Sequence, residues 1–387
     1  MLPLDLDVCQ KASRYATRVC QEMTKRSSLI KDLKPDCVPS FERDEIMPYL
    51  GDKLGKGGFN SVYELEKIEL DESAPVSNED HRRQRSQVAH GLSRKLAVKF
   101  LNESAMGNSN EFCNGAADLL LEAKYLSALS NHPHPCIISL HGVAAAGAAG
   151  FATGQMGGYF LVVDRLYDTL DKRIDVWKEL KRRKLRHSSQ MNIKILQAMF
   201  LQRLQVATDI CSAIRHLHKL NVVFRDLKPD NVGFDFDGRV KLFDFGLAKE
   251  LDPLQKTADG TMYEMSGGTG SRRFMAPEVA LGEPYNLSAD IYSFAILFWE
   301  LVALEKAFGK LSQEEHRKNV IEKNDRPPLK KEWKPAIQYI LQSCWKRNPK
   351  DRVNSNDLYK TLKEQVDLYY EDGFEPCEEG REKRLCI

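Results

Sequence analysis

The first part of the chain follows the pattern of a β-sheet. From Ile46 onward, short apolar runs separated by turns predict strands. Ser61–Leu70 alternates apolar and charged residues, as a half-buried strand does, whereas Leu96–Leu101 and Tyr159–Val163 are continuous apolar runs. Asp118–Leu129 differs, because its apolar residues recur at helical spacing. We therefore expect a sheet accompanied by one main helix in this region.

Three segments interrupt this pattern. Residues 1–45 form a mixed N-terminal extension in which Ala12–Met23 predicts a short helix. Residues 71–94 are polar, and we expect a loop there. Residues 144–158 are rich in alanine and glycine, which favours a flexible loop, and a tolerated insertion rather than a ligand site.

After about residue 165 the pattern becomes helical. Leu196–Leu220 is a long amphipathic stretch, and Ala289–Ala303 is so apolar that it predicts a buried helix. Two further helical patterns, Pro335–Lys346 and Asn356–Tyr370, precede an acidic C-terminal tail. A β-rich part followed by a larger helical part predicts two lobes with a cleft between them.

Composition narrows the class of protein. The 387 residues include 57 basic and 55 acidic side chains, so the net charge of +2 does not favour nucleic acid or an anionic membrane as the main partner. The nine cysteines are scattered and never form a CxxC, which favours reduced thiols over a zinc site or a disulfide framework. No apolar run approaches the roughly 18 residues of a spanning helix, and the N-terminus lacks the basic leader of a secretory signal. We expect an intracellular, cytoplasmic protein without membrane insertion, and access to the nucleus stays open.

A glycine-rich turn is the first candidate for chemistry. Leu54–Val62 reads LGKGGFNSV and lies between two predicted strands. Glycines let backbone N–H groups approach phosphate oxygens because no Cβ stands in the way. A tight hairpin explains the same glycines equally well, so the turn alone does not decide between the two interpretations.

One lysine stands inside an apolar strand. Lys99 follows Ala97 and Val98 in a run that we expect to be buried, where an unpaired ammonium is costly. Glu122, in the helical stretch LLLEAKYLSAL, is the natural partner. The alternatives are a lysine at the strand edge whose ammonium reaches water, and a glutamate on a solvated helix face.

Polar side chains gather in two segments of the helical part. Phe224–Asn231 reads FRDLKPDN and places the carboxylate of Asp226, the ammonium of Lys228 and the amide of Asn231 within six residues. Asp244 follows in the sequence Asp-Phe-Gly after a strand-like run. A carboxylate and an amide from two loops suit Mg²⁺, which takes oxygen ligands and keeps several waters.

Taken together, these motifs resemble those of the eukaryotic protein kinases. The glycine turn, the strand lysine, RDLKPDN, DFG and APE occur in that family's order. The resemblance covers roughly residues 46–368, and Lys228-Pro229 is similar to the serine/threonine version of the catalytic loop. MAPEV and CWKRNPKDR look like the tyrosine-kinase-like branch, in which Arg352 pairs with Glu278.

The resemblance implies a bilobal α+β kinase fold and an activity. The expected N-lobe, residues 46–163, holds a small antiparallel sheet, the mainly helical C-lobe covers 165–369, and the acidic tail is 370–387. The implied reaction transfers the γ-phosphoryl group of ATP to serine or threonine hydroxyls of protein substrates in intracellular signalling, with Mg²⁺ as cofactor.

Each motif then takes the family's role. Lys99 holds phosphates and is fixed by Glu122, Asp226 accepts the hydroxyl proton, and Lys228 neutralises the moving phosphoryl group. Asn231 and Asp244 are the implied Mg²⁺ ligands. The implied nucleotide contacts include the backbone of the segment connecting the lobes and a small gatekeeper residue, Val163; in full they are Leu54, Gly55, Lys56, Gly57, Gly58, Phe59, Val62, Ala97, Lys99, Val163, Asp164 and Leu166.

Two departures from the family pattern leave a second reading open. Phe224 replaces the histidine of the H-R-D motif, and Asn60 replaces the last glycine of the phosphate loop. A phenylalanine preserves packing while losing hydrogen bonds, and asparagine tolerates turn conformations. The alternative is a pseudokinase scaffold that binds nucleotide and signals through protein contacts.

Control is the last expectation from the sequence. Arg225 precedes the implied base, and in the family an arginine there binds a phosphate on the activation segment, here 244–278. We expect an upstream activating kinase to modify one of Thr257, Thr261 and Ser266, without a ranking among them. The alternative is a kinase that is active unmodified, with Arg225 paired to a local carboxylate or carbonyl. Ser271 takes the place of the family's substrate-contacting threonine, with Thr269 as the alternative. The basic run 178–186 is expected to be a solvated face between helices.

Overall fold

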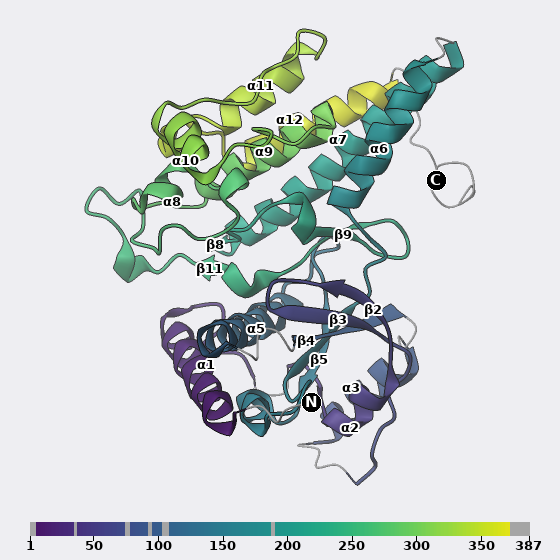
Figure 1. The fold of residues 1–387 in the computed structure, drawn as a ribbon, viewed down its shortest axis with the longest axis vertical. Helices are drawn as coiled ribbons and strands as arrows, with labels where there is room; N and C mark the ends of the chain where they lie inside the picture. The colour runs from purple at the N-terminus through teal and green to yellow at the C-terminus, as the bar shows by residue number, and fades with distance from the viewer. Residues whose placement is uncertain are drawn as a thin grey trace. The chain divides into compact units, whose positions relative to one another are not determined.

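A computed structural model describes residues 5–34, 37–73, 78–91, 95–102, 108–186 and 190–371. The chain divides into two compact units (Figure 1). The first unit consists of residues 1–166 together with 244–247, and the second consists of residues 167–243 and 248–387. The first unit thus includes residues 1–45 and 244–247, which lie outside the expected N-lobe of residues 46–163.

A twisted sheet forms the centre of the first unit. Among the described residues it has six strands, ordered β1-β5-β6-β4-β3-β2, and every pairing is antiparallel except that of β1 with β5. The strands are β1 (Ser40–Phe41), β2 (Leu50–Lys56), β3 (Asn60–Leu65), β4 (Leu96–Leu101), β5 (Leu140–Ala144) and β6 (Phe160–Asp164). All residues of β4 are buried, because strands flank it on both sides and α5 packs against it.

The predicted strand at Ser61–Leu70 was too long. β3 ends at Leu65, because the chain then leaves the sheet and bonds to the short helix α2 (Arg43–Ile46). Glu69 N–H donates to the carbonyl of Glu45, and Asp71 N–H donates to the Glu45 carboxylate at 2.7 Å. The alternation of residues 66–70 therefore has no sheet partner.

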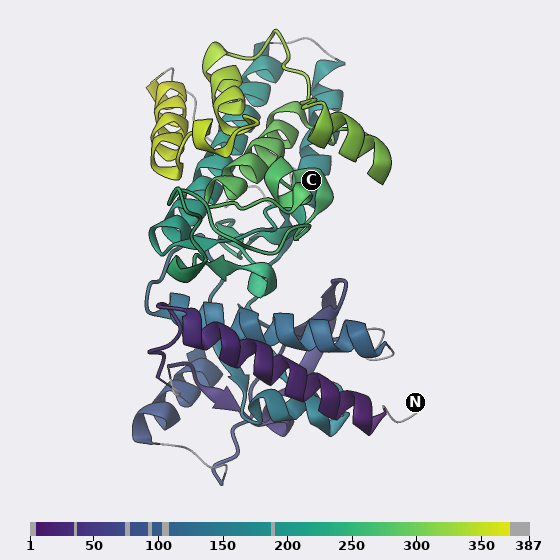
Figure 2. The same ribbon diagram turned by 90° about the vertical axis from the view of Figure 1, so that its left-hand side faces the viewer.

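Two long helices lie along each other beside this sheet. The helix expected at Asp118–Leu129 is α5 (Ser109–Ser130), and the one expected at Ala12–Met23 is α1 (Leu6–Arg26), each longer than predicted. Figure 2 shows α1 running along α5, and the two are in contact. The buried face of α1 consists of the small residues Cys9, Ala12, Ala16 and Cys20, which permit close packing.

The prediction of a loop over residues 71–94 was wrong. Residues Glu79–Gly91 form helix α3, while 74–77 and 92–94 lie outside the described residues. Its buried residues are polar: Arg85 forms an ion pair with Glu45, and the Ser40 N–H donates to Nε2 of His81 at 2.9 Å. A helix anchored by polar side chains has no apolar periodicity to reveal it.

Residues 144–158 are also not the flexible loop that their composition predicts. Gly147–Thr153 form the 3₁₀ helix η3, which packs on α1 and buries Phe151. The Ser13 hydroxyl of α1 donates to the carbonyl of Ala148 at 2.8 Å. A Cβ at Gly150 would collide with the backbone of Gly158, so glycine there serves close packing.

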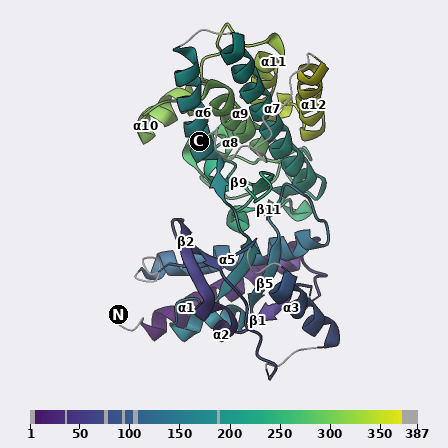
Figure 3. The ribbon, with the colours of Figure 1, turned by 90° about the vertical axis from the view of Figure 1, so that its right-hand side faces the viewer.

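Helices dominate the second unit (Figure 3). The long amphipathic helix α7 (Gln190–Lys219) packs against both α6 (Leu170–Leu185) and α12 (Ser355–Glu371). Residues 289–303 of α9 (Ser288–Ala303) are all buried, as predicted. The remaining helices and strands are α8 (Pro277–Leu281), α10 (Gln313–His316), α11 (Pro335–Cys344), β7 (Asp168–Thr169), β8 (Val222–Val223), β9 (Val232–Phe234), β10 (Val240–Leu242) and β11 (Lys249–Glu250).

The basic run 178–186 lies within α6 for most of its length, not between helices as predicted. Arg182 and Arg183 both donate to Glu179, and these bonds lower the pKa of Glu179 to about 2.

No helix in the described part of the chain is long and apolar enough to cross a membrane. Beyond Glu371, the rest of the predicted acidic tail lies outside the described residues.

Candidate active site

A buried lysine pairs with two carboxylates in the first unit. Lys99, on the central strand β4, donates through Nζ to Glu122 Oε2 at 2.6 Å and to Asp244 Oδ1 at 2.9 Å. Lys99 and Glu122 are only 8% and 3% exposed, so neither a strand-edge lysine nor a solvated glutamate describes them. The predicted pair is confirmed.

Electrostatics keep this lysine charged. Burial alone would lower the pKa of Lys99, but the carboxylates of Asp244 and Glu122 outweigh burial and raise that pKa above its ordinary value. Burial raises the pKa of Glu122, because it disfavours the charged carboxylate, whereas the nearby ammonium of Lys99 lowers it. At neutral pH the ammonium is therefore present and held in one place.

The segment that carries Asp244 packs on α5. Asp244 adopts a positive φ of 71°, which is uncommon outside glycine, and the 3₁₀ helix η5 (Phe245–Leu247) follows it against α5. The Phe245 N–H helps to hold the Glu122 carboxylate, and Gly246 lies so close to Asp118 that a Cβ there would be 3.1 Å from the Cβ of Asp118. The DFG motif is thereby placed beside the helix that carries Glu122.

The glycine turn joins β2 to β3 as predicted. Gly57 N–H donates to the Asn60 carbonyl at 2.8 Å, and the amide of Asn102 lies 3.4 and 3.3 Å from the carbonyl oxygens of Gly57 and Gly58. A Cβ at Gly55 or Gly58 would meet nothing within 4 Å. Packing within the first unit therefore does not require glycine at these two positions.

The second unit holds the polar loop of residues 224–231, whose side chains bond to one another. Asp226, 8% exposed, accepts from Lys228 Nζ at 2.8 Å and from Asn231 Nδ2 at 2.9 Å, both at Oδ2. The Ser271 N–H donates to Asp226 Oδ1 at 2.7 Å, and Lys228 Nζ also donates to the Ser271 hydroxyl at 2.8 Å. The structure thus places Ser271 beside the loop, whereas Thr269 bonds to Ser266 instead.

Asp290 holds the backbone of this loop in place through hydrogen bonds. Fully buried at the start of α9, it accepts from the N–H groups of Phe224 at 2.8 Å and Arg225 at 2.9 Å. His218 Nε2 contacts the same carboxylate at 3.0 Å, and Arg225 has a positive φ of 71°. Asp290 and His218 belong to none of the motifs in the sequence, and their partners come from distant segments of the chain.

A second buried ion pair ties the end of the activation segment to the helical unit. Arg352 donates to both oxygens of Glu278, at 2.6 and 2.8 Å, and to the carbonyl of Ser288 at 3.0 Å. This predicted pair is also confirmed.

Comparison with known proteins agrees with this geometry. Residues 83–362, more than half of the chain, match the family model described as the protein kinase domain. The chain belongs to the protein kinase family. It is 34% identical over 42% of its length to the serine/threonine-protein kinase STY17 of Arabidopsis thaliana, and 35% identical over 41% of its length to the serine/threonine/tyrosine-protein kinase HT1 of the same plant. It is also 32% identical over 42% of its length to the dual specificity protein kinase shkD of Dictyostelium discoideum. These matches span 27%, 39% and 21% of the relatives' own lengths.

The three candidate phosphorylation sites in the activation segment of this kinase have different hydrogen-bond partners. The hydroxyls of Thr257 and Thr261 both donate to Asp259, at 2.6 and 2.7 Å. Ser266 instead accepts from the Arg225 guanidinium at 2.9 Å. Only Ser266 among the three touches the arginine that the sequence suggested as a phosphate ligand.

The other expected nucleotide contacts lie in the first unit, most of them on its strands. Leu54, Gly55 and Lys56 are in β2, Val62 is in β3, and Ala97 is in β4. Val163 and Asp164 end β6, and Leu166 closes the first unit's main segment.

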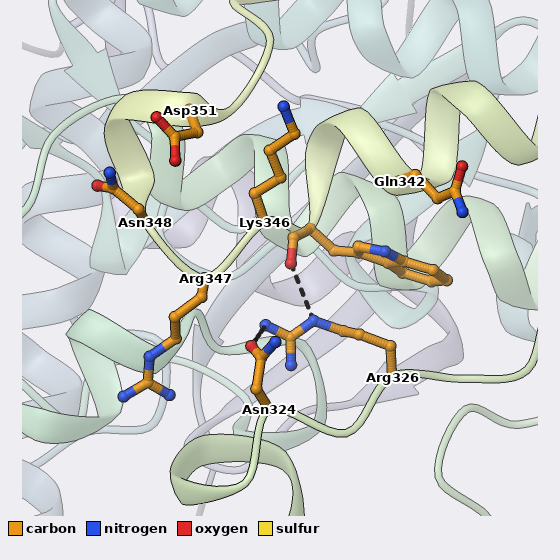
Figure 4. Close-up of a pocket in the computed structure, with 8 residues that line it drawn as sticks. Asn324, Arg326, Gln342, Lys346, Arg347, Asn348 and Asp351 are labelled. Carbon is orange, nitrogen blue, oxygen red and sulfur yellow. Dashed lines mark hydrogen bonds between the residues drawn. The ribbon is translucent and has the colours of Figure 1, made fainter.

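Residues within 324–351 of the second unit line a pocket (Figure 4). Arg326 donates through Nε to the carbonyl of Trp345 at 2.9 Å at its wall. None of the site residues expected from the sequence lines it; its lining is Asn324, Arg326, Gln342, Trp345, Lys346, Arg347, Asn348 and Asp351.

Proposed function

We propose that this kinase transfers the γ-phosphoryl group of ATP to serine or threonine hydroxyls of protein substrates. The observation that carries the proposal is the buried ammonium of Lys99, held between Glu122 and the half-exposed Asp244. A lysine ammonium has three donors, and these two carboxylates take two of them, so one is available for a phosphate oxygen.

The residues present fit a magnesium nucleotide. The Asp244 side chain is 43% exposed and offers carboxylate oxygen, and both hydrogen bonds of the Asn231 amide use its nitrogen, which leaves its oxygen as a ligand. The described residues contain no cluster of three His, Cys, Asp or Glu side chains that would form a complete metal cage. Mg²⁺ usually takes one or two protein ligands together with substrate phosphates, and when bound it supplies charge neutralisation at the phosphates.

The chain's own residues then have separate tasks. Lys99 binds phosphate oxygens and is kept in place by Glu122. Asp226, oriented by Asn231 and the Ser271 N–H, accepts the proton of the substrate hydroxyl. Lys228, which donates to both Asp226 and Ser271, offers positive charge beside that hydroxyl.

Transfer to a generic basic protein, followed by phosphoamino-acid analysis, tests the proposal. Labelled phosphate from ATP should appear on serine or threonine with the wild type and should fall by about 10²–10⁴-fold in Asp226→Asn, since that carboxylate is the proposed base. Label on tyrosine as well would indicate dual specificity, as in the name of the Dictyostelium relative.

The pseudokinase scaffold is the second candidate. Asn60 and Phe224 favour it, because they stand where the family pattern has the last glycine of the phosphate loop and the histidine of the H-R-D motif. Nucleotide binding equal in wild type and Asp226→Asn, without transfer by either, would support the scaffold and contradict the kinase. An ATP-dependent enzyme of this kind is expected inside the cell, and this localisation is part of the proposal.

We extend the proposal to control by phosphorylation of Ser266. A phosphate there would lie beside the Arg225 guanidinium, whereas one on Thr257 or Thr261 would lie beside the Asp259 carboxylate and be repelled. An upstream kinase is the partner that this implies.

Phosphatase treatment tests this extension. Dephosphorylation should lower activity about tenfold, the size of one hydrogen bond between charged groups, and Ser266→Ala should remove the response. Thr257→Ala and Thr261→Ala are matched controls that should keep it. Full activity after complete dephosphorylation of residues 257–269 would contradict the idea.

A further inference from the structure

Asp164, the last residue of β6, is bonded to the start of β5 and to the residue before it. The Asp164 carboxylate accepts from His141 Nε2 at 2.7 Å and from the Ser139 N–H at 2.9 Å. The Asp164 N–H donates back to the Ser139 carbonyl at 3.2 Å. Asp164 is thus attached to β5 through its backbone and its side chain.

The next residue is tied to the opposite side. The Arg165 guanidinium pairs with Glu64 of β3, and the Arg165 N–H donates to the Lys95 carbonyl, just before β4, at 2.8 Å. The sheet order is β5-β6-β4-β3, so the partners of Asp164 and those of Arg165 lie on opposite sides of β6. Two successive residues of a connecting segment are therefore fixed in orientation as well as in position.

His141 is the least expected member of this arrangement. Its imidazole and the Asp164 carboxylate are both mostly buried, at 17% and 20% exposure, so water competes only weakly for their hydrogen bond. An exposed pair of this kind contributes almost nothing measurable to the stability of the fold. The bond between His141 and Asp164 instead orients Asp164, the first residue of a segment whose backbone faces the ligand in the proposed function.

We propose that His141 is a positioning residue for the nucleotide base. Through Asp164 it holds the connecting segment so that its backbone N–H and C=O groups are preorganised for adenine, which lowers the ordering cost of binding. The inference rests on the proposed binding of ATP. It assigns His141 no contact with phosphate, metal or the protein substrate.

The proposal predicts a defect that is confined to the base. In the full-length chain, His141→Ala should weaken Mg·ATP about tenfold, as expected for losing one hydrogen bond to a charged group. Binding of Mg·tripolyphosphate, which has phosphates but no base, should be unchanged. The KM for ATP should rise in parallel, while the KM for the protein substrate stays the same.

Two further variants separate positioning from simple packing. His141→Gln places an N–H near the position of Nε2 and should restore ATP affinity. His141→Asn is the matched control, because its shorter amide reaches only the Nδ1 position and should not restore it. Both comparisons remain informative if the alanine variant folds poorly.

The possible results distinguish a failure of the role of His141 from a failure of the proposed function. Equal losses for Mg·ATP and Mg·tripolyphosphate, or equal ATP affinity in His141→Gln and His141→Asn, would overturn the role of His141 while leaving the kinase proposal intact. Failure of the wild type to bind Mg·ATP would instead overturn the proposed function, and this inference with it.

Discussion

The buried pair Lys99–Glu122 of the first unit and the buried pair Arg352–Glu278 of the second each join a cation to a glutamate, and the two pairs are built differently. Arg352 and Glu278 are almost completely buried, form two parallel hydrogen bonds, and have further partners in the Ser288 carbonyl and the Tyr292 ring, 5.1 Å from the guanidinium carbon. Lys99 and Glu122 are nearly as buried but share their lysine with the half-exposed Asp244.

This difference distinguishes a structural ion pair, Arg352–Glu278, from a candidate ligand-binding cluster around Lys99. The guanidinium satisfies a carboxylate with planar, bidentate geometry, so the arginine pair is complete within the protein. The lysine is a point charge among two carboxylates, and this cluster carries one negative charge in excess and keeps a donor available. A closed pair stabilises the fold, whereas the open one is the group that we propose to bind a cation and a phosphate together.

The largest expected effect comes from breaking the closed pair. Arg352→Ala leaves Glu278 buried without its charge partner, and the free energy of unfolding should fall by about 3–5 kcal/mol. Urea denaturation measures this. Lys350→Ala removes the exposed pair with Asp259 and should cost only about 0–1 kcal/mol. Similar losses in the two variants would mean that the buried pair has no special role.

Lys99→Met tests the open pair. Phosphoryl transfer should fall by about 10²–10³-fold, as for other lost donors at a charged transition state. Methionine fills the strand position and the protein should still fold, but the free energy of unfolding should also fall, because Glu122 stays buried without its ammonium partner. Thermal shift with Mg·ATP provides the second measurement. Lys53→Met, an exposed lysine on β2, is the control. A ligand-induced stabilisation that is unchanged in Lys99→Met would show that the lysine is not at the site.

Phe224→His probes the polar anchor beneath the catalytic loop. The side chain is completely buried, so an imidazole there should lower the free energy of unfolding by about 1–3 kcal/mol unless it finds a partner. Turnover should change little, since Asp290 holds the loop through the backbone N–H of residue 224, which the substitution keeps. Steady-state kinetics decide this, and a large loss of kcat would show that the phenyl packing itself orients Asp226.

The smallest expected effect concerns a carboxylate without any partner. Asp209 on α7 forms no hydrogen bond or ion pair within the described ranges, and burial raises its pKa to about 6. Because this folded-state pKa lies above the unfolded value, the acid stabilises the fold at low pH and loses that contribution as pH rises through about 6. Asp209→Asn should therefore stabilise at about pH 8 and not at about pH 4. Urea denaturation at both values, with exposed Asp237→Asn as control, would contradict this if the gain were independent of pH.

The sequence predicted the elements and pairs that follow from local pattern. The strand at Leu96–Leu101 and the helix at Ala289–Ala303 have uniform apolar character, and the chemistry of Lys99 required an acid nearby. Glu278 and Arg352 were found through motifs alone, 74 residues apart.

The rest depends on contacts between distant segments. Helix α3 is held by Arg85 and His81 bonding to residues about forty positions away, which no local period encodes. The same holds for the Asp290 anchor of the catalytic loop and for the bond from Arg225 to Ser266. Their partners are visible only once the chain is folded.

The helix at the N-terminus has a practical consequence for protein production. The buried face of α1, lined by Cys9, Ala12, Ala16 and Cys20, covers part of α5 and of η3. A recombinant fragment cut at residues 46–369, as the motifs alone suggest, would turn that covered area into an exposed apolar surface and would tend to aggregate. The boundaries for expression and crystallisation should therefore start before Leu6, and not at residue 83 where the family match begins.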